Sequence, residues 1–150
     1  MSDDLLCLLN LEARAAHLAD TAKWDELPSL WAADAVFHSF GRDYVGPHDI
    51  ASFMARRMSE HPGRHMLSTP VLSIDGDTAT ADVDYVFYRF SDLAVFSIGV
   101  YHDEFQRVDG SWLFSRREIE IHAYHPELTA VAKQSAEPLV HRLRREAESE

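Results

Sequence analysis

The sequence has little positive charge, cysteine or glycine, and each shortage excludes a class of protein. Lys and Arg number 14 against 25 Asp and Glu, which gives a formal net charge of -11. Because phosphate binding depends on Lys and Arg, this balance argues against a nucleic-acid partner. Cys7 is the only cysteine, so the chain has no intrachain disulfide and no thiolate metal cluster. The six glycines form no phosphate-binding loop, so we expect no nucleotide cofactor.

Long apolar runs are also missing. No stretch approaches the ~20 apolar residues that a membrane-spanning helix needs. The chain starts with the acidic segment MSDDLL, whereas a signal peptide has a basic start and a small-residue cleavage site. We therefore expect a cytoplasmic protein that has no membrane partner. A length of 150 residues is typical of one domain, so we expect a single domain over residues 1–150.

Histidine is frequent, with nine residues, yet its spacing does not predict a metal site. His122 and His125 are close in sequence, but neither an HExxH motif nor a Cys/His cluster with zinc spacing is present. A GxSxG motif, which would mark a serine nucleophile, is also missing. We therefore expect no metal and no cofactor.

The hydrophobic pattern predicts helices first. Apolar residues recur at helical spacing over 3–21, and a short second helix is expected over 23–31, broken or tightened at Pro28. A short strand and hairpin follow over 34–45, and Pro47 is well placed to begin a third helix that ends near Met58.

The remainder alternates like strands. Turn residues separate four long strands, predicted over 64–74, 78–90, 94–108 and 112–124. Helices followed by long antiparallel strands predict an α+β fold. Strands of ~12 residues twist and curl, so we expect a curved antiparallel sheet wrapped around the N-terminal helices and enclosing a conical cavity. The tail from Pro126 is helical in composition and is interrupted by Pro138.

Strand alternation also predicts the two faces of this sheet. The face with Val83, Tyr85 and Phe87 is expected to form a wall of the cavity. Phe96, Ile98 and Val100 alternate with their neighbours and are assigned to an apolar outer face. Such a face would drive self-association, so we expect a homo-oligomer, either a trimer or a dimer.

Four segments resemble the SnoaL-like branch of the nuclear transport factor 2-like superfamily. The first is DTAKWDELPSLWAADAVF, which begins at Asp20, and the others are VGPHDI from Val45, GRHMLS from Gly63 and YHDEFQRVDGSWLFSRR from Tyr101. The resemblance covers about residues 5–124. It implies an α+β barrel of the cystatin-like type, and by analogy with scytalone dehydratase it implies that residues 126–150 form a lid.

Asp20 and His65 gain meaning only through this resemblance. Alone, Asp20 looks like a solvated residue at a helix end, and His65 like a half-buried strand residue. Both positions match the catalytic dyad of the scytalone dehydratase and hexachlorocyclohexane dehydrochlorinase families. The resemblance therefore implies that His65 is a general base and that Asp20 orients it. Further polar groups of the dehydratase pocket are not reproduced at Arg89, Gly99 and Tyr101, which argues against scytalone as the substrate.

The remaining candidates are binding residues. The residues assigned to substrate binding are Phe37, Trp24, Tyr85, Arg89, Tyr101 and Arg117, with plain core packing as the alternative for the aromatic ones. Arg89 requires an anion, for which Asp84, a partner subunit and an acidic substrate are the candidates.

The activity that the resemblance implies is a cofactor-independent lyase, by dehydration or another β-elimination, or an isomerase or cyclase. Its substrate would be a hydrophobic cyclic or aromatic small molecule. The alternative is a non-catalytic binding or assembly subunit like the small subunit of ring-hydroxylating dioxygenases.

Overall fold

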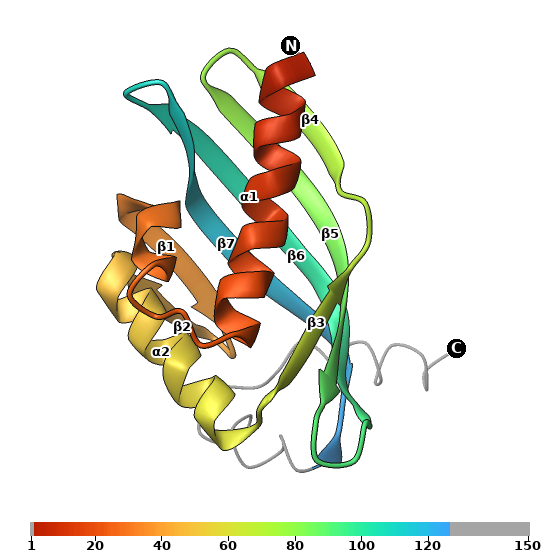
Figure 1. Cartoon of the computed structure of the whole chain (residues 1–150). Coiled ribbons are helices and arrows are strands. Elements are labelled where there is room, and N and C mark those ends of the chain that lie inside the picture. The colour runs from red at the N-terminus through yellow and green to blue at the C-terminus, as the bar shows by residue number, and fades with distance from the viewer. Residues whose placement is uncertain (1, 127–150) are drawn as a thin grey trace.

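The computed structural model describes residues 2–126, in which helices cover one side of a curved sheet (Figure 1). Its helices are α1 (Ser2–Asp20), the short 3-10 helix η1 (Leu27–Leu30) and α2 (Pro47–Glu60). Its strands are β1 (Trp31–Ser39), β2 (Arg42–Val45), β3 (Gly63–Leu67), β4 (Val71–Asp75), β5 (Thr78–Arg89), β6 (Val95–Val108) and β7 (Ser111–Tyr124). The α+β class and the helix-first order are confirmed. Only the 3-10 helix Leu27–Leu30 forms over 23–31, because Pro28 could not donate a backbone hydrogen bond inside a longer helix and instead stands in the first turn of η1, where no donor is needed. The tail assigned as a lid lies outside the described residues, except for Pro126 itself.

The sheet is mixed, which corrects the prediction of a purely antiparallel sheet. Its order is β2-β1-β7-β6-β5-β3, with β4 also paired to β5. All neighbouring pairs are antiparallel except β1 and β7, which run parallel. No hairpin joins these two strands, because most of the chain lies between them, so no tight turn fixes their relative direction.

The predicted strand over 64–74 is wrong in one respect, because it is broken into β3 and β4. Both pieces pair with β5, and residues 68–70 between them form no strand. Pro70 has no N–H group to donate and so interrupts the hydrogen-bond ladder. The connection stays close to β5, since the backbone N–H of Ser68 donates to the Asp84 carbonyl over 2.9 Å. The hydroxyl of Ser68 in turn accepts the N–H of Asp84 over 3.1 Å.

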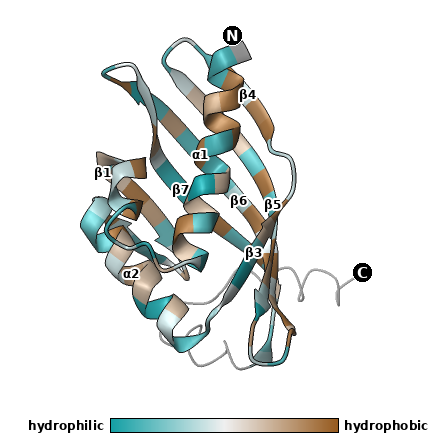
Figure 2. Cartoon of the chain, viewed as in Figure 1, coloured by the Kyte–Doolittle hydropathy of each residue, from teal (hydrophilic) through white to brown (hydrophobic). Residues whose placement is uncertain are grey.

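The core lies between α1 and the concave face of the sheet. Leu8, Leu11, Ala15 and Leu18 repeat at helical spacing and are all buried. Figure 2 shows the matching alternation of apolar and polar segments along the helices and strands. At the centre, the ring of Phe114 stacks on Trp31 with centroids 4.8 Å apart. No helix within the described residues is long and apolar enough to span a membrane.

Phe96 does not lie on the outer face of the sheet, contrary to the alternation argument. The pairing of β5 with β6 shifts here, since Phe87 pairs with Ser97 and Tyr88 with Val95. Phe96 is the extra residue of this bulge, and a bulge re-aims a side chain. Its ring therefore turns into the interior, where it is 2% exposed. Ile98 stays on the outer face, as predicted, and is 36% exposed.

Candidate active site

A cavity of about 120 Å³ lies between α2 and the concave face of the sheet. Strands β1, β3, β5, β6 and β7 contribute to its walls. Most of the lining is apolar, and its larger members are Phe37, Phe53, Met58, Phe87, Phe96 and Ile119. The polar groups that reach the lining come from histidine, tyrosine, serine and arginine, and within residues 2–126 no Asp or Glu contributes to it. In a protein with a net charge of -11, this lining is distinctive for its lack of acidic groups.

Asp20 and His65 lie together at one wall of this cavity. His65 Nδ1 is 2.6 Å from Asp20 Oδ1, and the backbone N–H of His65 donates to Asp20 Oδ2 over 2.9 Å. The Asp20 side chain is 5% exposed, and that of His65 is 16% exposed. The imidazole lines the cavity, whereas Asp20 lies behind it and faces a groove between α1 and β3.

This contact fixes the protonation pattern of the histidine ring. A carboxylate accepts hydrogen bonds, so the network assigns the proton of neutral His65 to Nδ1 and leaves the Nε2 lone pair free. Asp20 stands at the C-terminal end of α1, where the helix dipole disfavours a negative charge. The two N–H groups of His65 offset that cost. The ring is further held against Phe87, with centroids 4.6 Å apart.

Two tyrosines lie beside the dyad on the same sheet, and the ring centroid of Tyr101 is 6.5 Å from that of His65. The rings of Tyr85 and Tyr101 are stacked, with centroids 4.4 Å apart. Burial raises the pKa of Tyr85 to about 12 and raises the pKa of Tyr101 well above its ordinary value. Both phenols therefore keep their protons at neutral pH and can act as hydrogen-bond donors.

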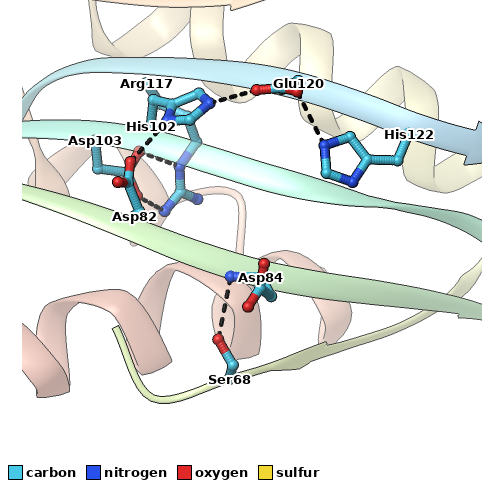
Figure 3. A network of polar contacts seen from close by, with 8 residues as sticks. All are labelled: Ser68, Asp82, Asp84, His102, Asp103, Arg117, Glu120 and His122. Carbon is cyan, nitrogen blue, oxygen red and sulfur yellow. Dashed lines mark hydrogen bonds and ion pairs between the residues drawn. The ribbon is translucent and has the colours of Figure 1, made fainter. Parts of the chain in front are cut away.

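Arg117 also lines the cavity, and carboxylates hold it from behind. Its Nε donates to Asp103 Oδ1 over 2.7 Å and its Nη2 to Asp103 Oδ2 over 2.6 Å, the contact drawn in Figure 3. The same Nη2 donates to Glu12 Oε2 of α1 over 2.7 Å. The guanidinium also lies over the Tyr101 ring at 4.2 Å. Burial alone would lower the pKa of Arg117, but the charge of Asp103, the largest of the opposing influences, holds the pKa above its ordinary value.

Phe37, Tyr85, Tyr101 and Arg117 thus line the cavity, but Trp24 and Arg89 do not. Trp24 lies in the turn between α1 and η1 and packs, partly buried, against the core. Arg89 ends β5 and turns toward the β5–β6 loop, where its Nη2 donates to Asp92 Oδ2 over 2.6 Å. Within the part of the chain that the structure describes, Asp92 and not Asp84 supplies an anion to Arg89. Trp24 and Arg89 therefore lie outside the lining of this cavity, and their part in substrate binding stays a prediction.

Several cavity residues were not predicted from the sequence. Helix α2 contributes Phe53, Met54, Arg57 and Met58, whose spacing of three and four residues marks one helix face. Glu12 was missed although it carried a signal. It lies four residues after Leu8 and three before Ala15, so a carboxyl group interrupts an otherwise apolar helix face.

A second set of histidines lies on the outer face of the sheet, away from the cavity (Figure 3). His102 bridges two carboxylates, with Nδ1 2.7 Å from Asp82 and Nε2 2.8 Å from Glu120. His122 Nε2 is 2.9 Å from the other oxygen of Glu120. On β1, His38 Nδ1 lies 2.6 Å from Asp43, an exposed counterpart of the buried dyad. Within residues 2–126, no group of three or more His, Cys, Asp or Glu side chains is arranged to hold a metal ion.

The fold and the cavity together define a curved-sheet α+β protein of the cystatin-like, nuclear transport factor 2-like class. Within that class, the SnoaL-like domain family matches residues 1–118, and the chain belongs to this family. Among the curated proteins, none matches this chain in sequence.

Solved structures of this class resemble the chain at low identity. A nuclear transport factor 2-like protein with a cystatin-like fold from Novosphingobium aromaticivorans is 24% identical, with a TM-score of 0.74 over 86% of this chain and 88% of that one. A hexachlorocyclohexane dehydrochlorinase from Novosphingobium barchaimii is 20% identical, with a TM-score of 0.70 over 81% and 88%. A structure described as the β subunit of an aromatic-ring-hydroxylating dioxygenase from N. aromaticivorans is 17% identical, with a TM-score of 0.71 over 83% and 92%. At these identities the likeness shows a common fold.

Proposed function

We propose that this protein is a cofactor-independent lyase, or an isomerase or cyclase, that abstracts a proton from carbon in a hydrophobic cyclic or aromatic small molecule. The observation that supports this most is the 2.6 Å contact between Asp20 and His65 at the wall of an apolar cavity. A histidine that is oriented by a buried carboxylate is an arrangement that general-base catalysis uses.

The proposed elimination moves one proton and one electron pair. His65 Nε2 takes a proton from a carbon next to an activating group. The electrons of that C–H bond form a double bond to the adjacent carbon, which releases its leaving group with the bonding pair. His65 becomes an imidazolium ion, whose charge the Asp20 carboxylate stabilises. An isomerase would return the proton to a different carbon, and a cyclase would let the carbanion attack a carbonyl carbon in the same molecule.

Negative charge that develops during this step would meet donors in the cavity. Tyr85 and Tyr101 present protonated hydroxyl groups, and Arg117 supplies a cation. Donors fixed before the reaction stabilise developing charge most effectively where water is excluded. The lack of acidic side chains among the described lining residues favours the same outcome, because none of these residues sets a carboxylate against the departing group.

The size of the cavity suggests a compact substrate. Its volume of about 120 Å³ is of the same order as the roughly 150 Å³ apolar cavity that accepts benzene in an engineered protein. The aromatic and aliphatic walls favour a ring over an extended chain. A leaving group such as hydroxide or halide adds few atoms to that volume.

The test is turnover of a panel of ring compounds that carry a hydroxyl or halide one carbon from an acidic C–H bond. Release of halide or formation of the conjugated product would be followed for the wild type and for His65→Gln and Asp20→Asn. The matched control is His38→Gln, which removes a histidine from the equivalent but exposed His–Asp pair. Activity that is lost in the first two variants and kept in the control supports the proposal. Activity that survives in His65→Gln overturns it.

A second candidate is the assembly role left open by the sequence, and one observation favours it. The β5–β6 hairpin presents exposed apolar side chains, with Phe90 51%, Leu93 75% and Val95 48% exposed. Apolar surface of this kind marks protein contacts, which fits a homo-dimer or trimer or a contact with another subunit. Sedimentation of the wild type and of Leu93→Glu tests it. A monomer in both cases would remove the support for assembly at this hairpin.

A further inference from the structure

A buried cluster beside the cavity contains one cation and two carboxyl groups. Arg117 comes from β7, Asp103 from β6 and Glu12 from α1, and their side chains are 4%, 0% and 2% exposed. Both carboxyl groups contact the same guanidinium nitrogen, Nη2, at 2.6 and 2.7 Å. Two full negative charges against one positive charge would leave a net charge in a buried site, which is costly.

The hydrogen bonds distinguish the two carboxyl groups. Each oxygen of Asp103 accepts a hydrogen bond from Arg117, one from Nε and one from Nη2, as a carboxylate does in a forked pair. Glu12 uses only Oε2, and its Oε1 is buried without a hydrogen-bond partner. Both carboxyl groups contact Nη2, so they lie close to each other. Two carboxyl groups that share a site disfavour the ionisation of both, which favours a proton on one of them.

We propose that Glu12 is protonated at neutral pH and serves as a positioning residue for Arg117, so that the cavity keeps a cation able to attract the anionic group of a ligand. A neutral Glu12 still accepts the Nη2 hydrogen bond through Oε2. It does so without adding a second negative charge behind the guanidinium. The link to a ligand rests on the proposed function, whereas the protonation of Glu12 does not.

The electrostatic surroundings support the same assignment. Burial is the largest influence and raises the pKa of Glu12 well above its usual range; the Arg117 charge lowers it and the Asp103 charge raises it again. Other charged or titratable groups of the neighbouring elements lie around the cluster and the adjoining groove: Tyr101 of β6, Arg64 and His65 of β3, and His17 and Asp20 of α1.

The end of Arg117 that faces the cavity is available to a ligand. Within the described residues, Nη1 of Arg117 donates no hydrogen bond, and this atom is not completely buried. It therefore has surface that a ligand can reach, and Arg117 lines the cavity. With Glu12 protonated, the cluster is neutral overall and its positive end points toward the ligand. Ionisation of Glu12 would make the cluster negative and weaken that attraction.

The direct test is the ionisation of Glu12 in the whole protein. The side-chain carboxyl ¹³C resonance of Glu12, assigned by its loss in Glu12→Gln, would be followed as the pH is raised from about 7 to about 11. We expect the shift of a protonated acid at pH 7 and a titration above it. Glutamine is an isostere of the neutral acid, so Glu12→Gln should fold with the stability of the wild type. A carboxylate shift at pH 7 would overturn the proposal. So would a large loss of stability in Glu12→Gln, because an ionised glutamate would then have been the native partner of Arg117.

The effect on ligands has its own measurement, with benzoate as the anionic probe and benzamide as its uncharged analogue. We expect benzoate to bind more tightly than benzamide at pH 7, and its affinity to fall about tenfold as Glu12 ionises, from the repulsion between two nearby charges. The decrease should vanish in Glu12→Gln and persist in Glu104→Gln, which alters an exposed outer-face residue. Benzoate that binds no better than benzamide, or the same decrease in Glu12→Gln, would overturn this role. If these expectations hold but no ring compound is turned over, the proposed function fails and the assignment of Glu12 stands.

Discussion

Replacing Asp20 with asparagine should reverse the protonation of the His65 ring while leaving the fold almost intact. The carboxylate accepts two N–H groups of His65, one from Nδ1 at 2.6 Å and one from the backbone at 2.9 Å. Asparagine offers one oxygen and one NH₂ group. The backbone N–H can only donate, so the amide oxygen must face it and the NH₂ group must face the ring. Nδ1 then becomes an acceptor, and the ring proton moves to Nε2, the atom that would otherwise act as the base.

The magnitudes follow from this exchange. Both hydrogen bonds survive in Asp20→Asn and only the charge is lost, so the free energy of unfolding should fall by about 1 kcal/mol. Proton abstraction should fall by roughly 10⁴-fold, the effect of the same change in a catalytic triad. Asp20→Ala leaves both N–H groups of His65 without an acceptor in a half-buried site, so the free energy of unfolding should fall by about 2–5 kcal/mol.

Two assays separate these effects. The ¹⁵N shifts of the imidazole nitrogens report which nitrogen carries the proton, and urea denaturation reports stability. A proton that stays on Nδ1 of His65 in Asp20→Asn would refute the expected move of the proton to Nε2. An Asp20→Ala variant as stable as the wild type would refute the energetic part.

Three further changes test the structure around the site. Phe114→Ala removes a fully buried ring that stacks on Trp31 and packs at a tilt against Phe105, and should lower the free energy of unfolding by about 3–5 kcal/mol in urea denaturation. The hydrogen bond to Glu120, assisted by Asp82, raises the pKa of His102. Its stabilisation should be complete below the unfolded pKa of about 6.5 and lost as the pH rises through the raised value, and His102→Gln should remove that pH dependence. The hydrogen bond from Arg89 lowers the pKa of Asp92 to about 2. Stability from this pair should be present above the unfolded pKa of about 3.9 and lost as the pH falls toward 2, and Asp92→Asn should flatten that part of the acid-denaturation curve.

Signals from residues close together in the sequence were sufficient to predict most of the helices, strands and turns. The apolar spacing of α1, Pro47 at the start of α2 and the turns at Gly76 and Gly110 depend only on neighbours in sequence, and all appear in the structure. The break between β3 and β4 was also readable, since Pro70 cannot donate to a strand ladder. The direction of β1 against β7 was not readable, because no local turn connects the two strands.

The site depended on contacts between distant parts of the chain. Asp20 and His65 are 45 residues apart, and Glu12 and Arg117 are 105 apart. Nothing in the local pattern pairs them, and the dyad was found only through a family resemblance. For Arg89 the contact that was missed is a local one, because Arg89 donates to Asp92, which lies three residues away in the next loop. Phe96 was misplaced because strand alternation cannot anticipate a bulge.

The central claim is that His65 removes a proton from carbon inside the cavity, and isotope exchange tests it without knowledge of the true leaving group. Wild-type protein would be incubated in deuterium oxide with small cyclic ketones that lack a leaving group, and deuterium at the carbon next to the carbonyl would be measured by mass spectrometry. The account predicts catalysed incorporation by the wild type and by His38→Gln, and background incorporation by His65→Gln. Incorporation by His65→Gln at the wild-type rate, or none above background by the wild type, would contradict it.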